Sequence, residues 1–399
     1  MIQLGCFDGG VQDSECKAYL RTVEELTRLA LANVKAGPDK VTLKKYLPEP
    51  QMMSVAEMQQ GLKRIGFFTA GKVDGICGYR TQSAIRLFQE YLRAFENHAD
   101  IIPDGQFGPK SQAHLRRWLD GRLRSEWAPS IEAWQAGTLG PCEYTAWLAL
   151  LQKARQRYLG HPNQALEKVN AYNGATGTHK VAQWDFSARV SAHLIGIRRE
   201  EATGKSDDVF LLLMKGLVFK FQGSTEPGAA EDPAKGFPFL MLGQHDYHFG
   251  WHHATYLALR PQTNVLVVRW KDKQFSDAAL ANPLEPNLTI NIHWGGRGLK
   301  GELNSWSEGC QVVSGSVYVN PRGNLVDCRK FMGITPDDPI KVPGKTRGAY
   351  NVLVDLVTAL SSDQNATVKY TLIAEADLDL DPELKAKVAD ARAKVLAVS

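Results

Sequence analysis

Two copies of a glycine-containing turn, each followed by a helical pattern, constrain the fold of residues 52–121 most strongly. Residues 73–78 (VDGICG) and 103–108 (PDGQFG) share the spacing Asp-Gly-x-x-Gly. Glycine favours the backbone of such turns and interrupts the helices on either side. Apolar residues around the turns recur at helical spacing, and Ser54-x-x-Glu57 forms a capping box that begins the first run. We therefore predict three packed helices.

This segment resembles the three-helix peptidoglycan-binding domain found in many wall-acting enzymes, and the resemblance covers the whole of residues 52–121. It implies that glycan or stem peptide binds in a groove beside the Asp-Gly turns. Asp74, Arg80 and Asp104 are the candidate substrate-binding residues of that groove. The apolar residues of the helices are expected to pack in the core of the domain.

A strand pattern that ends in a histidine precedes a glycine-rich loop and a cysteine. Residues 288–293 (LTINIH) alternate in polarity and predict a strand with His293 at its end, and residues 311–313 form an apolar run directly after Cys310. A neutral imidazole beside a thiol generates thiolate, which is the attacking species. Gly309 permits a tight turn that directs the backbone amides of residues 309 and 310 at a developing oxyanion.

The run from His293 to Cys310 resembles the signature of L,D-transpeptidases of the YkuD type, in which a histidine is followed, after a short spacer, by Ser/Thr-His-Gly-Cys. Glu308 stands where that family usually has its second histidine. Residues 306–311 (WSEGCQ) more closely resemble a phage-like branch of cysteine peptidases. The resemblance implies that Cys310 is the nucleophile and His293 the base, and that Ser307 orients His293 or the loop.

The implied enzyme acts on peptidoglycan stem peptides through an acyl-enzyme. Cys310 attacks the carbonyl of an L-centred residue, such as diaminopimelate, whose amide runs to a D-residue, and His293 takes and returns the proton. Water as acceptor gives L,D-carboxypeptidase or endopeptidase activity, and an amine gives L,D-transpeptidation. No cofactor and no metal is expected. The side chains expected to line the substrate cleft are Trp294, Arg297, Trp306, Glu308 and His253.

The order of the strand patterns agrees with this resemblance. A hairpin is predicted within residues 209–222, a Ser-Thr-Glu-Pro-Gly turn follows at 224–228, and further strands are predicted at 265–269 and 368–373. We expect these strands to form a mainly β, YkuD-like β-sandwich over residues 191–376.

Helical patterns dominate the rest of the chain. The expected segments are an N-terminal helical segment at 1–50, a helical linker at 122–190, a helix at 349–360 and a C-terminal helical tail at 377–399. The whole is therefore predicted to be a multidomain α+β protein, with an all-α wall-binding domain joined to a mainly β catalytic domain.

A histidine cluster offers a different chemistry. His245, His248, His252 and His253 lie close together in sequence, and a zinc-dependent peptidoglycan peptidase is the alternative enzyme. The sequence lacks an HExxH motif and a convincing second set of ligands. A polar loop that borders the substrate cleft explains the cluster as well. A non-catalytic cell-wall-binding protein is the alternative from outside the enzymes.

Charge and hydropathy exclude two classes of partner. A net charge of +4 over 399 residues is too small to indicate nucleic-acid binding. No apolar run reaches the length of a membrane span, so we expect no membrane insertion. Six cysteines without a CxxC pair argue against a zinc ribbon, and synthesis in a reducing compartment favours thiols.

The first ten residues lack the basic and apolar regions of a signal peptide. We therefore expect synthesis in the cytoplasm and action in the periplasm or cell wall after non-Sec export, injection or phage lysis. The corresponding proteins are a housekeeping wall enzyme, an antibacterial type VI secretion effector and a phage-type endolysin. An effector would have a cognate immunity protein or a component of the secretion machine as partner.

Overall fold

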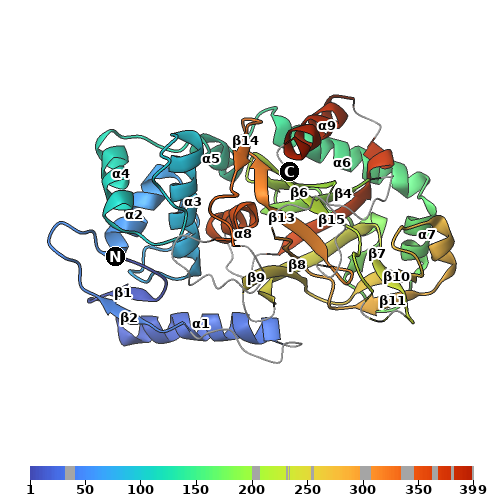
Figure 1. Cartoon of the computed structure of the whole chain (residues 1–399), viewed down its shortest axis with the longest axis horizontal. Coiled ribbons are helices and arrows are strands. Elements are labelled where there is room, and N and C mark those ends of the chain that lie inside the picture. Colours follow the sequence, from blue (N-terminus) through green and yellow to red (C-terminus); the bar gives the residue numbers. More distant parts are fainter. Residues whose placement is uncertain are drawn as a thin grey trace.

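The structure is a computed structural model that describes residues 1–31, 41–199, 207–230, 232, 234–252, 256–296, 307–333, 346–361, 367–378 and 382–397. A helical lobe and a β-rich lobe lie at the two ends of the long axis (Figure 1). Helix α8 (Ala349–Leu360) lies between them and packs on α3 (Tyr79–Phe95). Among the described residues, no helix is both long and apolar enough to cross a membrane.

The helical lobe contains the three predicted helices, α2 (Val55–Ile65), α3 and α4 (Pro109–Asp120). The predicted capping box is present, because the Ser54 hydroxyl accepts from the backbone amide of Glu57 and the Glu57 carboxylate accepts from that of Ser54. Aromatic rings fill the core, and the ring centroids of Phe67 and Tyr91 are 5.3 Å apart. The prediction of an all-α domain here is confirmed.

The β-rich lobe contains a ten-stranded sheet, and without β3 (Thr178–His179) and β14 (Leu325–Asp327) eight strands remain. In spatial order these are β12 (Ile292–Trp294), β9 (Tyr256–Pro261), β8 (Gly243–His252), β15 (Val368–Ala374), β4 (Ala192–Arg198), β5 (Asp208–Met214), β6 (Leu217–Ser224) and β13 (Gln311–Val319). β12 pairs with β9 on one side and with β13 on the other, so the order returns to its first strand. The sheet is therefore a closed barrel.

A smaller sheet consists of β7 (Phe237–Leu240), β10 (Val265–Trp270) and β11 (Leu284–Asn287). The expected β-sandwich is thus wrong for the main sheet, because the three-residue strand β12 joins its two edges. The strand predicted at 288–293 is also shifted. Only its last two residues belong to β12, which continues to Trp294.

Helices cover the outside of the closed sheet. They include α5 (Ala128–Ala136), α6 (Glu143–Gly160) and α9 (Pro382–Leu396), whereas α7 (Gln164–Ala171) packs on the short helix Asp277–Ala281. In α6 the Trp147 side chain is fully buried, and the Glu143 carboxylate lies 2.7 Å from the Lys220 ammonium of β6. All of β5 is buried, as expected for a strand that is covered on both faces. The segment 122–190 is therefore part of the core and not a spacer.

The N-terminal segment contributes β1 (Cys6–Asp8), α1 (Asp13–Leu31) and β2 (Lys44–Tyr46). Helix α1 contacts β8, and β1 bridges to the first Asp-Gly turn at Ile76. This segment therefore touches both lobes. All six cysteines of the chain are present as thiols.

Candidate functional site

Strands β12 and β13 bring His293 and Cys310 to one face of the closed sheet. The two strands run parallel, with Ile292 opposite Gln311, and the backbone amide of Gln311 donates to Asn291 O at 2.7 Å. One residue earlier in this register, Cys310 lies opposite Asn291. Side chains alternate between faces along a strand, so Asn291, His293 and Cys310 all project from the same face.

The Cys310 sulfur is held between two backbone groups of the segment before β12. The Asn291 amide donates to Sγ at 3.4 Å, and the thiol donates to Thr289 O at 3.3 Å. The Cys310 side chain is half-buried. The amide hydrogen bond favours the thiolate, whereas the bond from the thiol to Thr289 O favours the protonated form.

The ring of His293 is fixed by two contacts. Its Nδ1 atom lies 2.9 Å from Trp294 O, and its ring stacks on that of His252 with 4.3 Å between centroids. A carbonyl oxygen only accepts, so Nδ1 carries the proton of the neutral ring and Nε2 is the basic nitrogen. His293 is only 5% exposed. Its ring is therefore held in one orientation, as expected for a pre-oriented base.

The turn before Cys310 is built by Ser307 and Gly309. The Ser307 hydroxyl donates to Cys310 O at 2.6 Å and accepts from the Gly309 amide at 3.3 Å. Ser307 therefore orients the loop. The expectation that the Gly309 amide points at an oxyanion is wrong for this conformation, because that amide is directed at Ser307.

Glycine is required at position 309 for two independent reasons. Its φ is +123°, and a Cβ there would lie 2.6 Å from Cγ of Pro238 in β7. The neighbouring Glu308 side chain is exposed. Its carboxylate is therefore well solvated, which weakens its influence on the nearby sulfur.

Arg260 and His248 were not expected at this site, but strand pairing brings them to it. Leu259 pairs with Ile292, so Arg260 shares the face of His293, and His248 lies opposite Arg260 on β8. Burial lowers the pKa of Arg260, and a negative charge on Cys310 counteracts this shift. The charge of Arg260 thus favours the thiolate. Only knowledge of the β9–β12 pairing identifies this arginine.

The prediction for the substrate cleft also named Trp294, Arg297, Trp306 and His253. Trp294 is fully buried, and the Arg347 guanidinium lies over its ring at 4.4 Å, so it does not line a cleft as predicted. Arg297, Trp306 and His253 lie outside the described residues.

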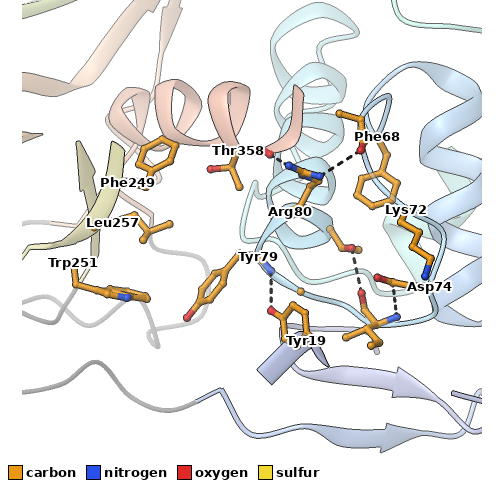
Figure 2. Close-up of a pocket in the computed structure, with 15 residues that line it drawn as sticks. Tyr19, Phe68, Lys72, Asp74, Tyr79, Arg80, Phe249, Trp251, Leu257 and Thr358 are labelled. Atoms are coloured by element: carbon orange, nitrogen blue, oxygen red, sulfur yellow. Dashed lines mark hydrogen bonds between the residues drawn. The ribbon is translucent and has the colours of Figure 1, made fainter. Parts of the chain in front are cut away.

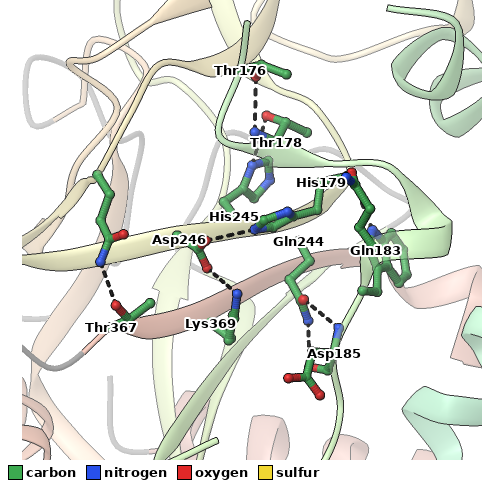
Figure 3. Close-up of polar contacts among 12 residues, drawn as sticks. Thr176, Thr178, His179, Gln183, Asp185, Gln244, His245, Asp246, Thr367 and Lys369 are labelled. Atoms are coloured by element: carbon green, nitrogen blue, oxygen red, sulfur yellow. Dashed lines mark hydrogen bonds and ion pairs between the residues drawn. The ribbon is translucent and has the colours of Figure 1, made fainter.

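The histidine cluster is divided between the two faces of β8, because side chains alternate along a strand. Figure 3 shows His245 beside Thr178. His245 is fully buried, with Nδ1 3.1 Å from the Thr178 hydroxyl and Nε2 3.2 Å from Met241 O. Burial lowers its pKa to about 3. His248 and His252 project from the other face. The described histidines of this run therefore do not form the zinc cluster of the alternative enzyme.

Within the described residues, the group spaced for a metal ion is Glu96, His98 and His114, which lies in the helical lobe. It is remote in the chain from Cys310 and joins no strand of the closed sheet.

Asp74 and Asp104 stabilise their own turns. Asp74 Oδ1 accepts from the Ile76 amide at 2.9 Å and from the Gln59 side chain at 2.9 Å. Asp104 is held in the same way by Gln89, with 3.1 Å between Nε2 and Oδ1. Both carboxylates are engaged within the fold, and the expectation that they contact substrate is not supported by these contacts.

Arg80 lies at the start of α3, at the edge of a cavity of about 160 Å³ between the lobes (Figure 2). Its guanidinium donates to Thr358 O at 3.2 Å and to Ala70 O at 3.3 Å. Of the three predicted wall-binding residues, Arg80 and Asp74 line this cavity and Asp104 does not.

The comparison with protein families identifies the helical lobe. A family model described as "putative peptidoglycan binding domain" matches residues 52–94, which span α2, the first Asp-Gly turn and most of α3. No curated protein matches the chain. No solved structure matches it either. The helical lobe therefore contains a cell-wall-binding module whose partner is peptidoglycan.

Proposed function

We propose that this protein is a thiol enzyme that modifies peptidoglycan stem peptides, with Cys310 as nucleophile and His293 as general base. The observation that carries the proposal is the placement of both side chains on one face of adjacent strands, with Nδ1 of His293 fixed by Trp294 O. A base held in one tautomer on the same face as a thiol is an arrangement that can activate a nucleophile. The wall-binding module supplies the class of substrate.

Two features support an ionised sulfur. The Asn291 amide donates to Sγ at 3.4 Å, and Arg260 interacts electrostatically with Cys310. Both favour the negative form, because each places a partial or full positive charge near the sulfur.

The proposed reaction proceeds in two balanced steps. The Cys310 thiolate adds to the carbonyl carbon of an L-centred residue, the C–N bond of the L,D-amide breaks, and the amine leaves with the proton that His293 Nε2 took from the thiol. Water or a second amine then attacks the thioester, gives its proton to His293 and releases the thiol. The first acceptor yields hydrolysis and the second yields transpeptidation.

Asn291 is the residue best placed to contact the amide under attack. It is 9% exposed, and its Oδ1 atom has no hydrogen-bond partner among the described residues. Because it lies opposite Cys310, a substrate amide bound at the sulfur would satisfy this buried group.

Muropeptide mass spectrometry after incubation with purified sacculi tests the proposal. The wild-type protein should release or exchange stem-peptide fragments, and Cys310→Ala and His293→Ala should each abolish this change while still sedimenting with the sacculi. A chelator should have no effect. Full activity of Cys310→Ala would rule the proposal out.

A non-catalytic wall-binding protein is the second candidate, favoured by the family match to residues 52–94. It predicts that the wild-type protein sediments with sacculi but leaves their muropeptide profile unchanged. The same incubation therefore separates the two functions.

A further inference from the structure

A cavity of about 160 Å³ lies between the helical lobe and the closed sheet (Figure 2). Four parts of the chain line it: α1, the segment from Phe68 to Thr81, strands β8 and β9, and α8. The part between Phe68 and Thr81 lies inside the region that matches the wall-binding family. The cavity is thus formed jointly by the wall-binding module and the β-rich lobe.

This cavity is distinct from the Cys310 site. Trp251 of β8 and Leu257 of β9 line it, and these two residues pair with each other. Their neighbours His252 and Tyr256 project from the opposite face, where His252 stacks on His293. The two sites therefore occupy opposite faces of the same pair of strands.

The walls combine flat aromatic surfaces with charged groups. Tyr79 and Trp251 meet edge to face, with 5.8 Å between ring centroids, and both are half-buried. Tyr19 completes the aromatic side, while the exposed Lys72 lines the cavity next to the Asp-Gly turn (Figure 2). Aromatic faces pack against the C–H faces of sugar rings, and charged groups bind hydroxyls and carboxylates.

The lining is held in place before any ligand binds. The Tyr19 hydroxyl accepts from the Tyr79 amide at 3.3 Å, and Arg80 is fixed by Thr358 O and Ala70 O. A preorganised pocket binds with a smaller loss of conformational entropy.

We propose that this cavity binds a sugar ring of the peptidoglycan glycan strand, with Trp251 and Tyr79 against the ring and Lys72 near the oxygen atoms of the sugar. The inference rests on the wall-binding half of the proposed function and does not depend on catalysis by Cys310. It assigns glycan recognition to the junction of the lobes, and leaves stem-peptide recognition to the other face of the sheet.

Binding measurements with separated wall components test this assignment. The probes are soluble glycan strands freed of stem peptides and, separately, free stem tetrapeptides, titrated into full-length Cys310→Ala by calorimetry. The comparison variants add Trp251→Ala or Lys72→Ala, with the exposed Lys110→Ala as a matched control from the same lobe. Because Lys72 is exposed, its variant should fold even if Trp251→Ala does not.

We expect glycan strands to bind Cys310→Ala, with affinity reduced roughly tenfold by Trp251→Ala, severalfold by Lys72→Ala and not at all by Lys110→Ala. Glycan affinity that is unchanged by both cavity variants, or binding of the tetrapeptide alone, would overturn the inference. Failure of the catalytic proposal would look different, since it leaves glycan binding intact and muropeptide profiles unchanged.

Discussion

Arg86 and Asp355 form a buried, two-point ion pair across the junction of the two lobes. Nε of Arg86 lies 2.8 Å from Oδ2 of Asp355, and Nη2 lies 2.6 Å from Oδ1. The pair joins α3 of the wall-binding module to α8, and its side chains are 10% and 3% exposed. A module fixed in this way presents bound wall polymer in a constant orientation to the β-rich lobe.

Removing one partner of this pair should destabilise the whole protein. Arg86→Ala leaves the Asp355 carboxylate buried without its cation, and we expect a loss of about 3–5 kcal/mol in the free energy of unfolding. The apolar double variant Arg86→Met/Asp355→Leu should lose less. Urea denaturation measures both, and an unchanged midpoint for Arg86→Ala would show that the junction does not contribute to stability. The exposed Lys110→Ala serves as the control.

Gln59 should be essential to the first Asp-Gly turn. Its side chain donates to Asp74, Ile76 O and Thr81, and accepts from the amides of the turn, so Gln59→Ala leaves several buried groups unpaired. We expect a loss of about 1–3 kcal/mol. Its exposed neighbour Gln60 makes a matched control, since Gln60→Ala should leave the urea midpoint unchanged. Equal midpoints for the two variants would contradict this account of the turn.

Much of this organisation was predictable because it is local. The helical patterns of residues 52–121 and 349–360 and the hairpin within residues 209–222 depend on neighbours in the chain, and the structure contains all of them. Closure of the sheet was not predictable, because β12 is only three residues long and its pairing with β9 rests on the single residue pair Ile292 and Leu259.

Sequence reasoning likewise identified only part of the candidate site. His293 and Cys310 were identified from one short motif, whereas Arg260 reaches them only through the pairing of β9 with β12. Trp294 was predicted to line the cleft with other residues that follow His293. Both faces of β12 are buried, so that inference failed at this strand.

Gly309→Ala should distort the turn that presents Cys310. The required φ of +123° and the contact with Pro238 both oppose a Cβ, and strain of about 1–3 kcal/mol is expected. Alkylation of Cys310 by iodoacetamide, followed by peptide mapping, should slow or accelerate severalfold as the sulfur leaves its two backbone partners. Gly140→Ala, where a Cβ meets nothing within 4 Å, should react like the wild type. Identical alkylation rates in both variants would show that the turn tolerates a side chain.

Stability should fall in mild acid because two histidines are buried as neutral rings. Burial lowers the pKa of His193 to about 4 and that of His245 to about 3, from 6.5. Below pH 6.5 the unfolded chain therefore takes up protons at these two histidines while the folded chain does not. The free energy of unfolding consequently decreases as the pH falls from 6.5 towards about 4. The slope is about 1.4 kcal/mol per pH unit for each ring.

Urea denaturation between pH 7 and pH 4.5 measures this slope, and His245→Gln should reduce it by about 1.4 kcal/mol per pH unit, the contribution of one ring. The change in slope is independent of any constant loss of stability that the substitution causes. A slope that is the same in the variant and the wild type would contradict a neutral, buried His245.

The central claim is that Cys310 carries the acyl group, and the most direct measurement is the mass of the protein quenched in acid during reaction with soluble muropeptides. We expect an added mass equal to an acyl stem peptide, mapped to the peptide that contains Cys310, in the wild type and not in Cys310→Ala. Turnover of muropeptides by Cys310→Ala, or an adduct that maps to another residue, would contradict the account.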